Sequence, residues 1–273
     1  MKNVVCICLA LFWMAVAIQA TELLTPKGGV EGCLLRDGRL LYANEDDEGD
    51  IWLMLDARKL LEGHTPKLSP DGNYVAFCTG YGRPSVKLLK TDDWSVISPT
   101  EKICPEKGAF WWVGDNLLVW QKGEKTFAYS PESLEIRTFM QLPKNTLAVS
   151  QDGKKIVVKR KTGLAVQTVE GKILVEIEMP DTATSETFRV NSPVFSPDGS
   201  KVAYVQEGIR PIADIMLLDL KTETTKAVTA DGKDHKSPSF SPDGKELVFS
   251  GLKGESTVLY KQTLKMEEQA KDE

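Results

Sequence analysis

The chain has 273 residues, of which 27% are charged and 41% hydrophobic, and its formal net charge is −5. That length suits a single domain of the barrel or propeller kind. The acidic balance, without a basic patch interleaved with aromatic residues, argues against nucleic acid as a partner.

Residues 1–20 form an apolar leader with one Lys, a long apolar run from Val4 to Ile18 and small residues near its end. The segment is short and N-terminal, which predicts a secretory signal peptide and a periplasmic or secreted protein; the alternative is a retained membrane anchor. Cleavage would remove Lys2 and change the net charge from −5 to −6. After cleavage of the leader, the protein is not expected to insert stably into a membrane.

The dominant signal in the rest of the chain is an internal repeat. The sequence Ser-Pro-Asp-Gly begins at Ser69, Ser196 and Ser241, and each copy has a Pro shortly upstream and a short apolar strand downstream. Weaker copies complete the series, and the turn Asp recurs at six positions: Asp37, Asp71, Asp115, Asp152, Asp198 and Asp243. Their spacing of about 34 to 46 residues is typical of one four-stranded propeller blade.

The repeated turn has a physical reason. Pro presets φ for the second position of a type I turn, Asp suits the third, and Gly takes the left-handed position that follows, so the turn joins two antiparallel strands. The residue three before each turn Asp is apolar, and we expect it to pack one blade on another. These residues are Leu34, Leu68, Trp112, Val149, Phe195 and Phe240.

Together these features predict an all-β fold, a six-bladed β-propeller over residues 21–264, followed by a charged tail over 265–273. No sustained helical periodicity follows the leader, so almost no helix is expected. The last unit lacks an obvious outer strand, whereas residues 22–25 resemble the outer strands of other units. We therefore expect the N-terminal strand to complete the last blade and close the ring.

Three cysteines remain after the leader, Cys33, Cys78 and Cys104. An odd number allows at most one disulfide within the chain. Cys78 and Cys104 belong to the same unit and are the pair that would form it. Three reduced, mostly buried thiols are the alternative.

The repeats resemble those of the TolB-like propeller family, with the pattern Pro-x-Phe-Ser-Pro-Asp-Gly, an apolar strand, a polar loop and a strand ending near Leu-Asp. Residues 195–219 match the pattern over its whole length, and the resemblance extends over residues 22–264. It implies a stand-alone propeller without the additional N-terminal α/β domain of TolB. The same repeats accompany some serine peptidases, but no Gly-x-Ser-x-Gly sequence is present.

Candidate binding residues gather on the face opposite the Asp-Gly turns. His64 and His235 occupy equivalent connections between blades, where they could be ligands or acid–base groups, or polar loop residues bonded to backbone. Their placement in different blades matches no metal spacing. Arg83 and Arg210 lie on loops of the same face, where they would suit an anionic or polar ligand.

Two other features admit two interpretations each. The acidic run with Asp46, Asp47 and Glu48 could hold calcium or a basic partner, or be a solvated loop, and its spacing does not match an EF-hand. Trp111 could stack on a ligand or be buried between blades, whereas Trp112 is expected in the core.

The sequence thus predicts a protein-interaction scaffold of the cell envelope that performs no catalysis, with another envelope or extracellular protein as its partner. The chain is expected to be a monomer, and no cofactor or metal is expected. The alternative is a carbohydrate- or small-molecule-active enzyme or receptor with its site at the mouth of the central channel. The sequence contains no pair of carboxylates whose spacing indicates a catalytic site, which argues against that alternative.

Overall fold

The computed structural model describes residues 4–5, 21–25, 28–80, 85–99, 103, 105, 109–178, 189–208 and 212–264, with the backbone alone for residues 4, 5 and 189. Within these ranges the chain forms six β-sheets and no helix. The described part therefore offers no apolar helix of bilayer-spanning length.

Each sheet is one blade, and in blades 1, 2, 3 and 5 all four strands follow one another in the chain. Blade 1 contains β3 (Glu31–Leu34), β4 (Leu40–Glu45), β5 (Ile51–Leu55) and β6 (Arg58–Glu62). Blade 2 contains β7 (His64–Leu68), β8 (Tyr74–Thr79), β9 (Ser85–Lys90) and β10 (Val96–Ile97). Blade 3 contains β11 (Phe110–Val113), β12 (Leu117–Lys122), β13 (Lys125–Tyr129) and β14 (Ile136–Thr138).

The second half of the chain repeats this arrangement. Blade 4 contains β15 (Thr146–Val149), β16 (Lys155–Arg160), β17 (Gly163–Thr168) and β18 (Ile173–Glu178), and β1 (Val4–Val5) pairs with β18 in parallel. Blade 5 contains β19 (Arg189–Phe195), β20 (Lys201–Glu207), β21 (Ala213–Asp219) and β22 (Thr224–Ala227). Blade 6 contains β23 (His235–Phe240), β24 (Glu246–Lys253), β25 (Ser256–Thr263) and β2 (Glu22–Leu23).

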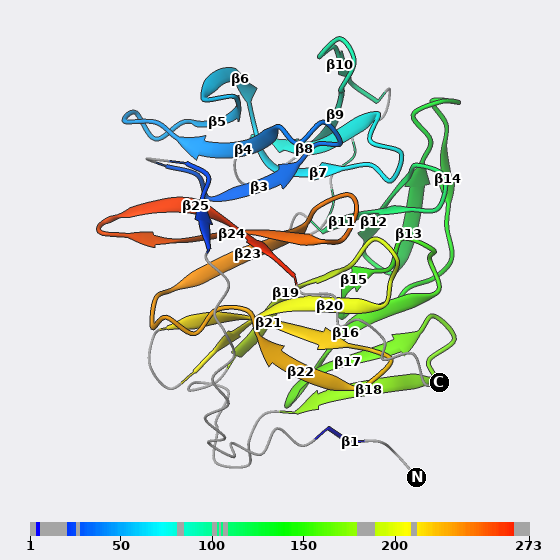
Figure 1. Ribbon diagram of the computed structural model, residues 1–273. Coiled ribbons are helices and arrows are strands. Elements are labelled where there is room, and N and C mark those ends of the chain that lie inside the picture. Colours follow the sequence, from blue (N-terminus) through cyan, green and yellow to red (C-terminus); the bar gives the residue numbers. More distant parts are fainter. Residues whose placement is uncertain are drawn as a thin grey trace, which may run out of the picture.

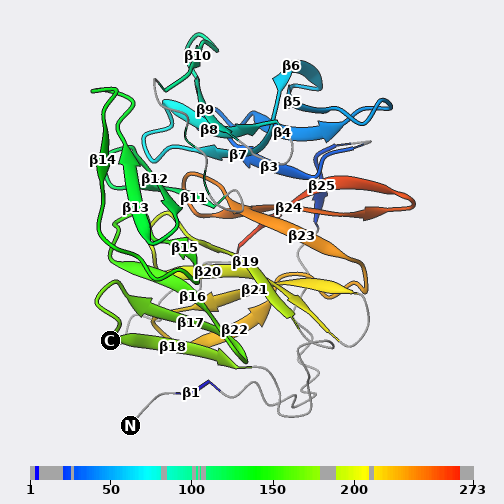
Figure 2. The same ribbon diagram turned by 180° about the vertical axis from the view of Figure 1, so that it is seen from behind.

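The blades form a closed ring. Their first strands contact one another in the order β3, β7, β11, β15, β19, β23 and back to β3. Figure 1 shows blade 6, in orange and red, beside blade 1, in blue. Figure 2 shows from behind that the first strands lie toward the middle of the molecule. The predicted all-β, six-bladed propeller is confirmed.

The N-terminal strand closes the ring, as predicted. β2 pairs with β25 in antiparallel register, with Glu22 opposite Lys261 and Leu23 opposite Tyr260. Lys261 also forms ion pairs with Glu22 at 3.3 Å and with Glu246 at 3.2 Å. The outer edge of the last blade is thereby covered by the other end of the chain, which removes an unpaired strand edge.

The hydrophobic core is divided into six layers, one between each pair of neighbouring blades. The residue three before each turn Asp packs against the preceding blade, as predicted. For example, Leu34 of blade 1 packs with Leu259 of blade 6, and Phe195 of blade 5 packs with Val166 of blade 4. Successive side chains of a strand point to opposite faces of its blade. Alternate residues along a strand therefore pack against the two different neighbouring blades.

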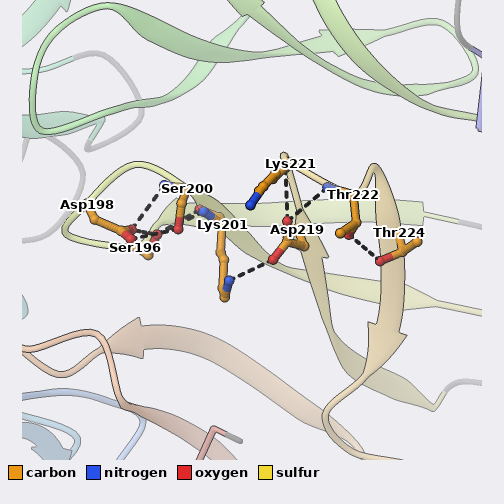
Figure 3. Close-up of polar contacts among 8 residues, drawn as sticks. All are labelled: Ser196, Asp198, Ser200, Lys201, Asp219, Lys221, Thr222 and Thr224. Carbon is orange, nitrogen blue, oxygen red and sulfur yellow. Dashed lines mark hydrogen bonds and ion pairs between the residues drawn. The ribbon is translucent and has the colours of Figure 1, made fainter. Parts of the chain in front are cut away.

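The repeated turns share a hydrogen-bonded ring around a buried Ser. In blade 5, Ser196 Oγ donates to Asp198 Oδ1 at 2.5 Å and accepts from the Lys201 amide at 2.9 Å, while the Ser200 amide donates to Asp198 Oδ1 at 3.0 Å (Figure 3). The same ring recurs around Ser69, Ser150 and Ser241. Gly199 follows with φ of 64°. The Ser is therefore as much a part of the turn as the Pro, Asp and Gly on which the prediction rested.

Neighbouring turns also bond to one another, which places them on one face of the disc, here termed the turn face. Arg36 Nη2 donates to the Pro70 carbonyl at 2.7 Å, and Lys155 Nζ donates to the Gly199 carbonyl at 3.0 Å. The opposite face, here termed the loop face, carries the starts of the first strands and the connections between blades. The first strands of the blades surround the centre of the ring between these two faces.

Candidate binding site in the central channel

The first strands of all six blades line a cavity of about 400 Å³ in the centre of the ring. Its wall combines apolar side chains such as Leu34, Val149 and Phe240 with hydroxyl groups of Ser and Thr. A volume of several hundred Å³ is within the range of binding pockets. The channel is therefore the candidate functional site of this propeller.

Three blades depart from regular strand geometry where they line this cavity. Thr65, Ser192 and Ser237 have φ of 54°, 49° and 52°, in the left-handed region that non-glycine residues seldom adopt. Each precedes a Pro, and each Ser/Thr-Pro pair has no partner in the register with the second strand. These are β-bulges at equivalent positions of blades 2, 5 and 6, where Pro is tolerated.

The bulges store backbone strain at the channel wall. A left-handed conformation costs an L-residue about 1 to 2 kcal/mol, and a β-branched Thr is a particularly unfavourable occupant. Ser192 is exposed and Ser237 half-buried, and their hydroxyls form no hydrogen bond with any described residue. Strain of this kind is often found at functional sites, which makes the channel wall a candidate binding site.

The two tryptophans at the channel connect blades. Trp112 Nε1 donates to the Lys67 carbonyl at 2.9 Å, and Trp111 Nε1 donates to the Leu147 carbonyl at 3.2 Å. Both side chains are buried, Trp112 with the core between blades 2 and 3 and Trp111 with the core between blades 3 and 4. Trp112 is in the core as predicted, and for Trp111 the alternative of burial between blades is the one observed.

The two histidines lie at equivalent places, at the start of the first strands β7 and β23, but in different settings. His64 is half-buried, and its Nδ1 lies 2.9 Å from Thr65 Oγ1, next to the bulge. His235 is 2% exposed; its Nε2 lies 2.8 Å from Asp231 Oδ1 and its ring contacts Phe249 edge-on. Blade 1 separates the two, so the structure does not bring them together.

His235 belongs to a polar group between blades 5 and 6. Its Nδ1 is buried and has no hydrogen-bond partner among the described residues. Nearby, Thr229 Oγ1 donates to Asp214 Oδ1 at 3.2 Å, and burial raises the pKa of Asp214. This group supports the packing of the two blades, because its members bond to one another rather than to the channel.

The acidic run forms the hairpin between β4 and β5. Asp46 Oδ1 accepts from the amides of Glu48 and Asp50 at 3.1 and 3.0 Å, while Asp46 Oδ2 accepts from Trp52 Nε1 and Lys59 Nζ, both at 2.8 Å. The Lys59 ammonium, more than the other donors, holds the pKa of Asp46 well below its usual range.

The carboxylates of Asp46, Glu48 and Asp50 come within 4.8 Å of one another. Both oxygens of Asp46 are nevertheless already occupied by donors of the loop itself. The contacts thus give Asp46 a structural role in the hairpin, and the exposed Asp47 and Glu48 remain on its surface.

Arg83, Arg210 and Cys104 lie outside the described residues. Cys33 and Cys78 are free, buried thiols, and burial raises the pKa of Cys33 to about 12 and that of Cys78 to about 11. Neither thiol is thereby suited to act as a thiolate nucleophile at neutral pH.

Sequence reasoning did not identify the channel residues Glu31, Thr65, Lys67, Ser192 and Ser237. A signal was present, since a Pro stands three residues before Ser69, Ser196 and Ser241. A Pro inside a predicted first strand indicates a bulge, because Pro cannot donate to the ladder. The residue before that Pro is the one that enters the left-handed region in all three blades.

Fold and site define a six-bladed propeller whose channel is lined by apolar side chains and hydroxyl groups and contains strained bulges. No known family profile matches the chain. Among solved structures, TolB from Acinetobacter baumannii superposes with a TM-score of 0.56 at 17% identity, over 86% of this chain and 61% of that chain. The predicted resemblance to TolB-like propellers is confirmed at the level of fold. An oligogalacturonate lyase in complex with manganese is similar with a TM-score of 0.48 at 15% identity, over 86% of this chain and 72% of that one.

A curated relative, the uncharacterized peptidase YuxL of Bacillus subtilis (strain 168), is 25% identical over 207 residues. The match covers 68% of this chain and 29% of the relative, so the chain spans under a third of that protein's length. This finding contradicts the prediction that the chain is not an enzyme. That prediction rested on the lack of a Gly-x-Ser-x-Gly sequence and of a carboxylate pair, and the lack of such motifs does not exclude an enzyme.

Proposed function

We propose that this protein binds extended peptide segments of other proteins in the central channel of its propeller, in the cell envelope or outside the cell. The observation that carries the proposal is the channel wall, where three strained bulges present Thr65, Ser192 and Ser237 to one cavity. Strain is retained during evolution where the surrounding structure and the function need that geometry.

The chemistry of the wall suits a peptide. An extended peptide needs apolar surface for side chains and polar groups for its backbone amides and carbonyls. The channel supplies both, with Leu68, Phe195 and Phe240 beside the free hydroxyls of Ser192 and Ser237. The similarity to a protein named as a peptidase supports the same class of ligand. The apolar leader supports export of the protein.

The test is to obstruct the channel without disturbing the blades. Ser192→Trp and Ser237→Trp each place a large side chain at the cavity wall, at positions whose present side chains bond to no described residue. Leu134→Trp is the matched control, because Leu134 has a φ of 60° and is an exposed residue of the outer turn of blade 3. Binding of fluorescent peptides from a casein digest is measured by anisotropy, and folding is checked by thermal melting.

We expect both channel variants to bind the peptides at least tenfold more weakly, about 1.4 kcal/mol, and the control to bind as the wild type does. If all three variants bind the peptides as tightly as the wild type does, the channel is not the peptide site. The exported location is tested separately, by fractionation of cells that express the full chain.

A further inference from the structure

The channel contains one carboxylate whose charge is not compensated by a direct partner. Of the described residues that line the cavity, Glu31 at the start of β3 and Lys67 in β7 carry charge. No ion pair joins them within 4.0 Å. The two charges influence each other electrostatically but form no direct ion pair.

Lys67 is directed to blade 3. Its Nζ donates to the Phe110 carbonyl at 2.8 Å and lies 4.5 Å from the centre of the Phe110 ring. Burial lowers the pKa of Lys67, and the negative charge of Glu31 opposes that effect. The ammonium thus has two partners of its own, a carbonyl dipole and an aromatic face, and both favour a cation at this place.

Glu31 has no comparable partner. Its Oε2 is buried without a hydrogen bond, and neither oxygen accepts a hydrogen bond from a described residue. The residue as a whole is half-buried, and it lines the cavity. A carboxylate in such a position favours a donor that carries positive charge, because removal from water without compensation is unfavourable.

We propose that Glu31 binds a primary ammonium group of the peptide that occupies the channel, either its free amino terminus or a Lys side chain. This inference rests on the proposed peptide binding and adds the chemical class of the peptide. The ammonium approaches Glu31 from the cavity, while Lys67 stays bonded to Phe110. The hydroxyls of Ser192 and Ser237, on blades 5 and 6, line the path of the same peptide.

The test uses the full chain and four forms of one probe, a decapeptide of alternating alanine and serine with lysine at its fifth position and a fluorophore at its C-terminus. The forms have a free or acetylated amino terminus, and lysine or norleucine at the fifth position. The variant is Glu31→Gln, which keeps the shape of the side chain and removes its charge. Glu31→Asp is a second variant that keeps the charge, and thermal melting confirms folding of both.

We expect Glu31→Gln to bind the ammonium-bearing probes at least tenfold more weakly and the probe without an ammonium group equally well. Loss of affinity on acetylation alone assigns the amino terminus, and loss on the norleucine change alone assigns the Lys side chain. If Glu31→Gln binds every form as the wild type does, while Ser192→Trp loses binding, the ammonium inference is wrong and the peptide channel stands. If Ser192→Trp also binds normally, both are wrong.

Discussion

Thr25 and Leu259, 234 residues apart, are joined by a hydrogen bond in which the Leu259 amide donates to Thr25 Oγ1 at 2.9 Å. The same hydroxyl donates to the Gly28 carbonyl at 2.6 Å, and Thr25 is 2% exposed. The Thr25 side chain thus fastens the N-terminal segment to the last blade. A contact between such distant residues restrains the whole ring, because it joins the two ends of the propeller.

Replacing Thr25 with Val should therefore weaken closure. The shape is retained, but the Leu259 amide and the Gly28 carbonyl lose their hydrogen-bond partner, which costs about 1 to 3 kcal/mol. Urea denaturation measures the change in the free energy of unfolding. Thr21→Val is the control, since the Thr21 hydroxyl is exposed and forms one long contact of 3.4 Å with Gln262. An equal effect of the two substitutions would speak against closure through Thr25.

Ser241→Ala should destabilise the turn of blade 6. Ser241 Oγ donates to Asp243 Oδ1 at 2.7 Å and accepts from the Glu246 amide at 2.9 Å, in a side chain that is 4% exposed. Losing both partners costs about 1 to 3 kcal/mol of unfolding free energy. Ser239→Ala serves as the control because its hydroxyl bonds to no described residue. A loss below 0.5 kcal/mol, roughly that of an ordinary surface change, would contradict the structural role of the turn Ser.

The pair Lys201 and Asp219 predicts a pH dependence of stability (Figure 3). The Lys201 ammonium, 2.7 Å from Asp219 Oδ2, is the main cause that lowers the pKa of Asp219 to about 2. Because the pKa is lower in the folded chain than in the unfolded chain, the stabilisation is present above about pH 4 and is lost as the pH falls toward 2.

Asp219→Asn should accordingly cost about 1 to 2 kcal/mol at pH 7, after allowance for partial exposure of the pair, and only a small part of that at pH 2. Thermal melting across this pH range provides the measurement. Asp115→Asn is the control, because Asp115 is exposed and bonds to no described residue. A constant difference between pH 7 and pH 2 for Asp219→Asn would rule out the ion pair as its source.

Ser192→Gly and Ser237→Gly should raise stability. Glycine adopts φ near 50° without the steric cost that Ser pays, although it loses more backbone entropy on folding, so the net gain is up to about 1 kcal/mol. The same changes remove channel hydroxyls and should weaken peptide binding. Ser239→Gly, at a regular strand position, should instead destabilise the protein. Lower stability in all three variants would show that the bulges are not strained.

His235→Ala should destabilise the interface of blades 5 and 6 by about 2 to 4 kcal/mol, through loss of a buried ring and of the bond to Asp231. His64→Ala, at a half-buried position, should cost less than about 1 kcal/mol. Differential scanning calorimetry compares the two. Similar melting temperatures for both variants would contradict the buried structural role of His235, and peptide binding by each variant tests the earlier expectation that the histidines take part in recognition.

The sequence by itself determined the number of blades and their closure. Repeated Asp-Gly turns, from Asp37 to Asp243, have local causes, since Pro, Asp and Gly each prefer one turn position and act on adjacent residues. Alternation along the first strands likewise predicted that Leu34 and Phe195 pack between blades. The turns and the alternation depend on neighbours in the chain, and closure followed from comparing the incomplete last unit with the strand-like residues 22–25.

Only the tertiary structure determined which polar residues lie near one another. Glu31 and Lys67 share the channel because two first strands contact each other, and His235 is buried because blade 5 covers it. Asp46 was predicted as a binding residue, yet its Oδ2 accepts from Trp52 and Lys59, and its Oδ1 accepts from two amides of the same loop. Burial and hydrogen-bond partners depend on residues distant in the chain, so the charge pattern could not separate a structural carboxylate like Asp46 from an unpartnered one like Glu31.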